Sequence, residues 1–183
     1  RSTQGVSSAA SDVYKRQLHD IPNTCVAAVK AIKDLKVNYL TIHISSGLDA
    51  LKAVKKVSGK TKIVGVSTLT SLNDKNLKQT GHTRSVKNLV IHQAKLAAKA
   101  SLDALVCSAH EVPYVKHIFK KEIITPGIRL VGDKTKDQKR IMTPGDAVRA
   151  GIDYIVVGRP ITGADDPVHA ACLVVREMTE ASG

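Results

Sequence analysis

Residues 39–70 read YLTIHISSGLDALKAVKKVSGKTKIVGVSTLT, and this stretch decides the fold. Two β-branched and almost entirely apolar runs, Tyr39–Ile44 and Lys62–Ser67, flank the segment Leu48–Lys56, in which apolar residues recur at helical spacing. A continuously apolar run is typical of a strand buried on both faces, as in a parallel sheet. The stretch therefore predicts two parallel strands joined by a right-handed helical crossover.

The same alternation continues outward in both directions. Further strand-like runs are Ala104–Cys107, Glu122–Thr125 and Tyr154–Val157, and further helical patterns are Thr24–Lys36, Ser85–Ala100 and Pro144–Ala150. This order predicts an α/β fold with a parallel sheet. Nothing resembles GxGxxG or GxxxxGK[ST], so a doubly wound dinucleotide or P-loop fold loses its main support. We therefore expect a (β/α)8 TIM barrel.

Polar or glycine-containing strings follow the predicted strands. They are Ser45-Ser46-Gly47, Thr68-Leu69-Thr70, Ser108-Ala109-His110, Pro126-Gly127-Ile128-Arg129 and Gly158-Arg159-Pro160. In a barrel the loops after the strands gather on one face and build the site. These strings are the candidate site.

The composition excludes several classes of protein. The formal net charge is +12, but aromatic residues make up only 3%, so the chain lacks the stacking side chains of a nucleic-acid binder and we expect no nucleic-acid partner. No apolar run reaches the length of a membrane span. The three cysteines form no CxxC pair, which predicts neither a disulfide framework nor a zinc site and fits a reducing cytoplasm. We expect a basic, soluble, cytoplasmic domain.

Residues 1–17 (RSTQGVSSAASDVYKRQ) have no apolar periodicity and no secretory h-region. Their reverse translation resembles a transposase-based sequencing adapter that ends in the transposon mosaic end at DVYKRQ. We therefore expect residues 1–17 to be a non-native, adapter-like leader and the native domain to comprise residues 18–183.

The string Leu18-His19-Asp20-Ile21-Pro22-Asn23-Thr24 combines a strand end with a helix start, at which Asn23 or Thr24 could cap the helix. Here the sequence resembles the orotidine 5'-phosphate decarboxylase family of bacterial type, whose motif is Asp-x-Lys-x-x-Asp-Ile-x-Asn-Thr. Four further strings match that family in order: Val66-Ser67-Thr68-Leu69-Thr70-Ser71, Val106-Cys107-Ser108-Ala109, Thr125-Pro126-Gly127-Ile128-Arg129 with Asp137-Gln138, and Val157-Gly158-Arg159-Pro160-Ile161-Thr162.

The resemblance implies roles for particular residues. Asp20 would be the last member of a catalytic Asp-Lys-Asp-Asp network, and Asp20, Ile21 and Thr24 would reach into the neighbouring subunit's site in a homodimer. The substrate, orotidine 5'-phosphate, would be held by further residues: Thr70 at the pyrimidine, and Pro126, Arg129, Gln138, Gly158 and Arg159 around the phosphate loop and clamp. Independently of the resemblance, loops after late barrel strands commonly bind phosphate, and a Gly-Arg pair suits that task.

The resemblance also implies decarboxylation to UMP in pyrimidine biosynthesis, without metal or organic cofactor. His43, His82, His92, His110 and His117 show no metal-ligand spacing, so structural or surface roles are expected for them, and a local hydrogen bond for His19. The lysine that supplies the positive charge and the proton aligns with position 17, where this chain has Gln17, and its partner aspartate aligns with Lys15.

We therefore expect an incomplete barrel that lacks the first two βα units and most of the third strand, and that is inactive as it stands. Two alternatives remain: a sugar-phosphate decarboxylase of the same suprafamily, and a non-catalytic nucleotide-binding homologue. The Ile-Pro-Asn-Thr and Gly-Arg-Pro-Ile-Thr strings favour the nucleotide enzyme.

Overall fold

A computed structural model describes residues 13–130 and 142–183. The strands are β1 (Val13–Leu18), β2 (Tyr39–His43), β3 (Lys62–Val66), β4 (Ala104–Val106), β5 (Glu122–Thr125) and β6 (Tyr154–Ile155). The helices are α1 (Pro22–Ala31), α2 (Leu48–Val57), α3 (Asp74–Gln79), α4 (Val86–Lys99), α5 (Val112–Lys116), α6 (Pro144–Arg149), α7 (Arg159–Thr162) and α8 (Pro167–Ser182). Short 3-10 turns lie at Lys33–Leu35, Ile44–Ser46 and Ala109–Glu111.

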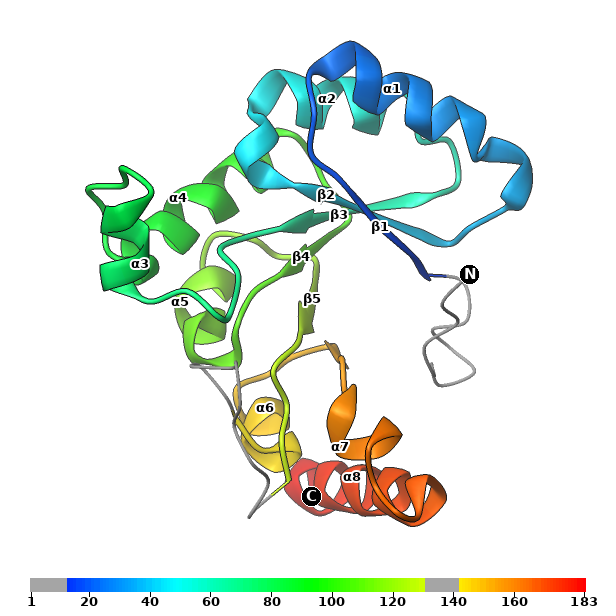
Figure 1. The fold of residues 1–183 in the computed structure, drawn as a ribbon, viewed down its shortest axis with the longest axis vertical. Helices are drawn as coiled ribbons and strands as arrows, with labels where there is room; N and C mark the ends of the chain where they lie inside the picture. The colour runs from blue at the N-terminus through cyan, green and yellow to red at the C-terminus, as the bar shows by residue number, and fades with distance from the viewer. Residues whose placement is uncertain (1–12, 131–141) are drawn as a thin grey trace.

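The strands form one six-stranded sheet in the order β1-β2-β3-β4-β5-β6, and every pair is parallel. Consecutive order is that of a barrel, whereas a doubly wound sheet reverses its order at a switch point. Figure 1 shows the helices around the outside of the curved sheet, with α1 and α2 above, α3 to α5 at the left and α6 to α8 below. The prediction of an incomplete α/β barrel is confirmed, since a closed barrel of this class has eight strands.

Strand β1 begins at Val13, inside the segment expected to be non-native. Its register with β2 is irregular: Tyr14 pairs with Leu40, but Leu18 pairs with Ile42, so β1 has extra residues between the two pairs. Backbone pairing is independent of side-chain identity, and the open edge of β2 offers unpaired N–H and C=O groups to any extended segment. The expected boundary at residue 17 therefore remains a prediction, although it does not coincide with an element boundary.

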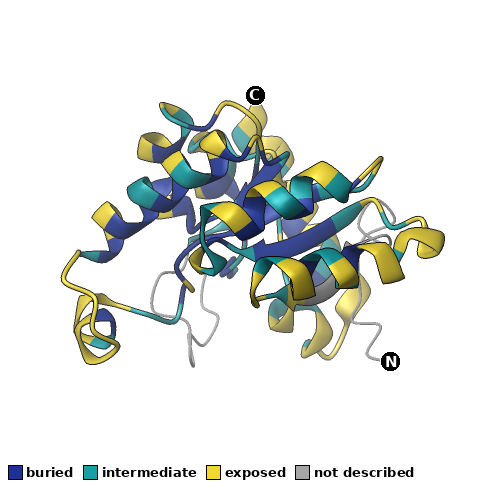
Figure 2. Ribbon diagram, turned by 90° about the horizontal axis from the view of Figure 1, so that it is seen from above, coloured by how far each residue is buried: buried dark blue, intermediate teal, exposed yellow. Residues whose placement is uncertain are grey.

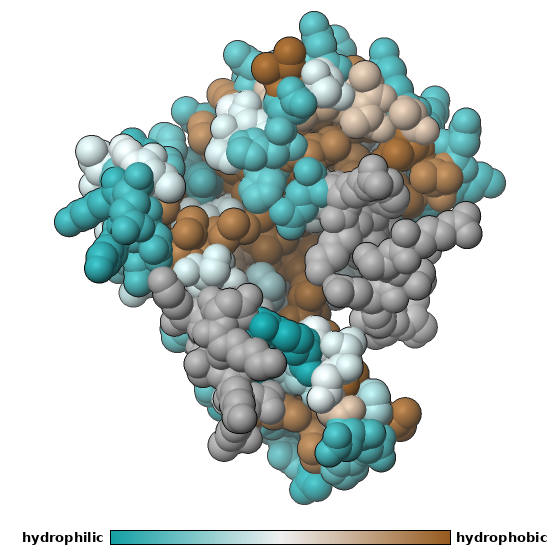
Figure 3. Space-filling model, in the orientation of Figure 1, coloured by the Kyte–Doolittle hydropathy of each residue, from teal (hydrophilic) through white to brown (hydrophobic). Residues whose placement is uncertain are grey.

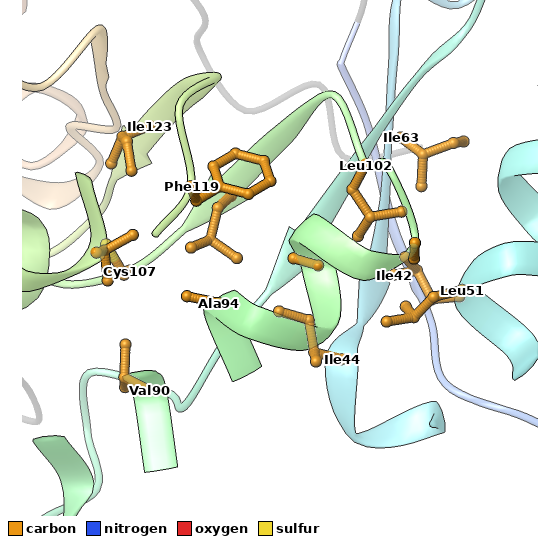
Figure 4. Packing of buried hydrophobic residues seen from close by; sticks show 14 of the residues in the cluster. Ile42, Ile44, Leu51, Ile63, Val90, Ala94, Leu102, Cys107, Phe119 and Ile123 are labelled. Atoms are coloured by element: carbon orange, nitrogen blue, oxygen red, sulfur yellow. The ribbon is translucent and has the colours of Figure 1, made fainter. Parts of the chain in front are cut away.

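The core lies between the sheet and its outer helices. Alternate strand residues such as Ile42, Ile63 and Leu105 are fully buried against Leu51 of α2 and Val90 of α4. Figure 2 shows the strands buried and the outward helix faces exposed, and Figure 4 shows the apolar side chains meeting in this layer. Truncating one such leucine to alanine costs about 2–5 kcal/mol, so this layer holds the curved sheet together.

The turns that precede β4 and β6 have the same local arrangement. Ser101 and Gly151 end the preceding helices with positive φ values of 56° and 81°, and an aspartate follows two residues later, just before the next strand. The Asp103 carboxylate accepts the Ile63 N–H at 2.8 Å, and the Asp153 carboxylate accepts the Ile123 N–H at 2.8 Å. Each aspartate thereby satisfies the amide of the second residue of the neighbouring strand and sets the strand alignment.

The first residues of four strands form a polar layer at the amino-terminal end of the sheet. Lys62 pairs with Glu122, the Tyr39 hydroxyl donates to Glu122 at 3.0 Å, and the Tyr154 ring lies 6.4 Å from that of Tyr39. The hydrogen bonds to Glu122 and then to Tyr39 raise the pKa of Lys62 above its usual value. In a barrel this end contributes to stability, whereas the site lies at the opposite end.

The start of α1 differs from its prediction. Ile21 is the N-cap residue and no side chain caps the helix, so the expected cap by Asn23 or Thr24 is wrong. Pro22 occupies the first helical position, where its fixed φ suits the helix and no amide is needed. No helix within the two described segments is both long and apolar enough to cross a bilayer.

Candidate active site

A pocket of about 220 Å³ opens at the carboxyl-terminal edge of the sheet. It is lined from the ends of β1, β3, β4 and β5: Gln17, Val66, Ser67, Thr68, Leu69, Thr70, Ser71, Val106, Cys107 and Pro126. Gln17, Thr70 and Pro126 were each singled out from the sequence as site positions, and Thr68 and Leu69 belong to one of the candidate strings. The parallel strands bring them together because their carboxyl ends meet on one face.

The pocket wall combines apolar side chains with buried hydroxyls. Ser67 is 4% exposed, and its hydroxyl has no hydrogen-bond partner within residues 13–130 and 142–183. Buried polar groups in proteins are nearly always paired, so an orphan hydroxyl in a pocket wall is suited to bind a ligand. The Thr68 side chain is fixed by a buried hydrogen bond, because its hydroxyl donates to the Gln93 side-chain oxygen at 3.0 Å.

Position 17 faces the pocket and contacts the end of β2. The Gln17 Oε1 atom lies 2.7 Å from Nε2 of His43, and the His43 ring lies 5.0 Å from that of His19. Nε2 of His19 is 3.1 Å from the Ser45 hydroxyl, so His19 does make a hydrogen bond, but to the segment after β2 rather than locally. Burial, and secondarily the charge of His19, lower the pKa of His43 below its usual value. The imidazole beside position 17 is therefore biased toward its neutral form.

The rest of the Asp20 motif lies beside the pocket rather than in its wall. Asp20 is exposed at the end of β1, where its Oδ1 accepts the Ile21 N–H at 2.7 Å. Ile21 is 65% exposed, and Thr24 is exposed on the first turn of α1. Beneath them Cys25 is buried and its thiol donates to the Asp20 carbonyl at 3.3 Å; burial raises the pKa of that thiol.

The predicted phosphate residues lie farther along the same edge. Gly158 is the N-cap residue of α7 and Arg159 is its first residue, and both are exposed. Arg129 follows β5 and is buried, with Nη1 donating to the Ile128 carbonyl at 2.7 Å. The pocket described above is lined by other residues than these three. Gln138 falls outside the described residues.

A wider hollow of about 570 Å³ lies on α8, away from these residues. Its lining is almost entirely apolar and consists of Pro167, Val168, Ala171, Cys172, Val175 and Arg176. Such a surface has no convergent polar groups to orient a small substrate, so the pocket at the sheet edge is the better candidate for chemistry.

Sequence reasoning missed His43. It was expected to have a structural or surface role because it shows no metal spacing, yet its imidazole contacts position 17 at the pocket. The available signal was its place at the end of the Tyr39–His43 strand, next to the Ser45-Ser46-Gly47 string. Only the register of β1 against β2 brings it to position 17.

The ordered parallel sheet and the pocket at its carboxyl edge define an α/β-barrel protein. Residues 16–173 match the sequence family described as "Orotidine 5'-phosphate decarboxylase / HUMPS family". The chain belongs to this family.

Individual relatives agree with the family match. The chain is 43% identical to an orotidine 5'-phosphate decarboxylase of Streptococcus pneumoniae over 168 residues, which cover 90% of this chain and 72% of the relative. It is 44% identical to that of Streptococcus mutans over 158 residues, or 84% and 69% of the two chains. A crystal structure of orotidine 5'-phosphate decarboxylase from Lactobacillus acidophilus superposes with a TM-score of 0.75 at 31% identity, over 88% of this chain and 72% of the other.

Proposed function

We propose that the protein from which residues 18–183 derive removes CO2 from orotidine 5'-phosphate to form UMP, a step of pyrimidine biosynthesis. The observation that carries this proposal is the pocket, in which position 17 meets Thr70, Pro126 and the orphan hydroxyl of Ser67. Three of the five strings that resemble the family contribute residues to the pocket wall, and the relatives named above have that activity in their names.

Residues at the carboxyl-terminal edge of the sheet can bind both the pyrimidine and the phosphate of the substrate. We assign the pyrimidine to the pocket, near Thr70 and Ser67, where buried hydroxyls can bond to its polar atoms. We assign the phosphate to Arg159 and the backbone of Gly158, with Arg129 and Gln138 as further contributors. An exposed guanidinium beside a glycine can form a bidentate, charge-assisted contact with phosphate oxygens.

The reaction leaves a carbanion at C6 of the pyrimidine, which needs a nearby positive charge and a proton. Gln17 can supply neither. We propose that the native residue at position 17 is a lysine, that residues 1–17 are a non-native leader, and that the chain as given has no decarboxylase activity. Asp20 would then be the surviving member of the catalytic network.

We also propose a homodimer with shared active sites in the cytoplasm. Ile21 is a large apolar side chain with 65% of its surface exposed, next to an exposed Thr24 and beside the pocket edge. A partner subunit would bury this side chain and bring both residues to a second site. The buried thiols of Cys25 and Cys107 suit a reducing compartment.

The deciding experiment replaces residues 1–17 with the aligned amino-terminal segment of the Streptococcus pneumoniae relative, with a lysine at the position that corresponds to residue 17. UMP formation by this chimera, absent from the chain as given, is the expected result. In the chimera, Arg159→Ala should raise KM strongly, while Lys95→Ala on the outer face of α4 is the matched control and should leave KM unchanged. A folded chimera that binds UMP in calorimetry without turnover would favour the non-catalytic homologue instead.

A further inference from the structure

His43 is the feature of the site that the proposed function does not use. It ends β2 on the concave side of the sheet, because the alternate residues Leu40, Ile42 and Ile44 point into the outer core. Its ring is half-buried, and its Nε2 atom points to the side chain at position 17, at 2.7 Å. Position 17 in turn lines the pocket.

We propose that His43 is a positioning residue, whose Nε2 atom holds the side chain at position 17 against the pocket and switches between donor and acceptor to suit it. The proposal rests on the proposed function in one respect: it takes the native residue at position 17 to be a lysine.

The chemistry of the imidazole requires this switch. A neutral imidazole carries one N–H donor and one acceptor nitrogen. In the structure the Gln17 oxygen faces Nε2 and can only accept, so in this arrangement His43 carries its proton on Nε2. A lysine ammonium can only donate, so with a lysine at position 17 the proton must move to Nδ1 and leave Nε2 as the acceptor.

The surroundings of His43 favour the neutral imidazole over the imidazolium. Burial and the neighbouring His19 disfavour the imidazolium, which would repel an ammonium at position 17. His19, which precedes α1, is the titratable ring nearest to His43, with centroids 5.0 Å apart. Its own Nε2 is engaged with Ser45, so it does not compete for position 17.

The switch can be read directly by NMR of the 15N-labelled chain at pH 8. Long-range 1H–15N spectra should show His43 as the Nε2–H tautomer in the chain as given and as the Nδ1–H tautomer in Gln17→Lys. Gln17→Met, which offers neither a strong donor nor a strong acceptor, is the matched control and should give a mixture. The resonances of His92 and His110 report that the fold is unchanged. An unchanged His43 tautomer in a folded Gln17→Lys variant would overturn the proposal.

A second measurement does not depend on assigning the imidazole. In Gln17→Lys, the acetylation rate of the introduced amine is followed by mass spectrometry and compared with the rate at the same position in Gln17→Lys/His43→Leu, because leucine, unlike asparagine, offers no acceptor. Loss of the acceptor should speed acetylation roughly two- to tenfold, as expected for one hydrogen bond to the ammonium. The exposed Lys95 serves as an internal control in the same digest, and equal rates for position 17 would contradict the proposal.

The outcomes separate this proposal from the proposed function. The tautomer and acetylation readouts need no substrate, so they can succeed even if the chimera fails to make UMP. In an active chimera, His43→Leu should lower kcat more than it changes KM and should shift the pH profile, whereas a merely structural role would lower the yield of folded enzyme and leave the profile in place.

Discussion

The half-buried His43 links the site to the pH dependence of stability. Its pKa is lowered in the folded chain by burial and by His19, so between that lowered value and the usual value near 6.5 the unfolded chain binds more protons. Stability is then lost as the pH falls through about 6.5. We predict that His43→Asn removes part of this loss, measured by urea unfolding at pH 8 and pH 5.5. The exposed His169→Asn is the control, and an identical pH slope in both variants would count against the assignment.

The candidate site shows what residue patterns can and cannot predict. Thr70 and Pro126 were found because polar residues after parallel strands gather on one face, whatever the details of the strands. His43 was missed because its contact with position 17 depends on the register of β1 against β2, which contains the irregularity between Tyr14 and Leu18. A pattern along one strand holds no information about the register of its neighbour.

Gly65 allows β3 to pack closely against the buried side chains that lie outside the sheet. A Cβ atom there would lie 2.8 Å from Leu102 Cδ1 and 3.1 Å from Ile44 Cδ1, and both side chains are buried. Glycine in a strand normally costs about 0.5–1 kcal/mol relative to alanine, but overpacking a core costs about 1–3 kcal/mol. We predict that Gly65→Ala destabilises the fold, measured by urea unfolding. The double variant with Leu102→Ala should be more stable than the sum of the single effects predicts; strict additivity would exclude the clash.

The turn after α4 offers a substitution that should stabilise the fold, in contrast to Gly65→Ala. Ser101 adopts φ 56°, a left-handed conformation that costs a residue with a Cβ atom about 1 kcal/mol. Gly151 occupies the equivalent place before β6. We therefore predict that Ser101→Gly raises the free energy of unfolding by up to about 1 kcal/mol, less the entropy that glycine adds to the unfolded chain. Lys95→Gly inside α4 should instead lower it by about 1 kcal/mol, so a loss in both variants would refute the argument.

The bounds of the strands and helices could also be predicted only in part from the sequence. The strand Glu122–Thr125 has the bounds that the sequence predicts. The predicted Tyr154–Val157 strand shortens to Tyr154–Ile155, since β6 is at the sheet edge and Val156 is 45% exposed. The helices α3 and α5 are too short for a helical period to be recognised in the sequence.

At the scale of the molecule, the open arc leaves apolar surface without a partner among the described residues. Figure 3 shows hydrophobic side chains in the middle of the face, over the strands, and the hollow on α8 adds Val168 and Val175, which are 74% and 61% exposed. Patches of this kind mark surfaces that another segment or protein covers. In a closed barrel, the helix ring would continue past α8 and cover this face.

Closure of the barrel should therefore make a charged residue on α8 destabilising, whereas the same residue should be tolerated in the open chain. In the chain as given, Val175→Lys should change the free energy of unfolding by less than about 0.5 kcal/mol, because the side chain is already in water. In the chimera that supplies the amino-terminal units, the same lysine would be buried and should cost roughly 2 kcal/mol or more. Asn88→Lys on the exposed surface of α4 is the matched control and should be neutral in both proteins. Equal urea midpoints for Val175→Lys and its parent chimera would show that the face of α8 stays open, and that the added units close the barrel elsewhere or not at all.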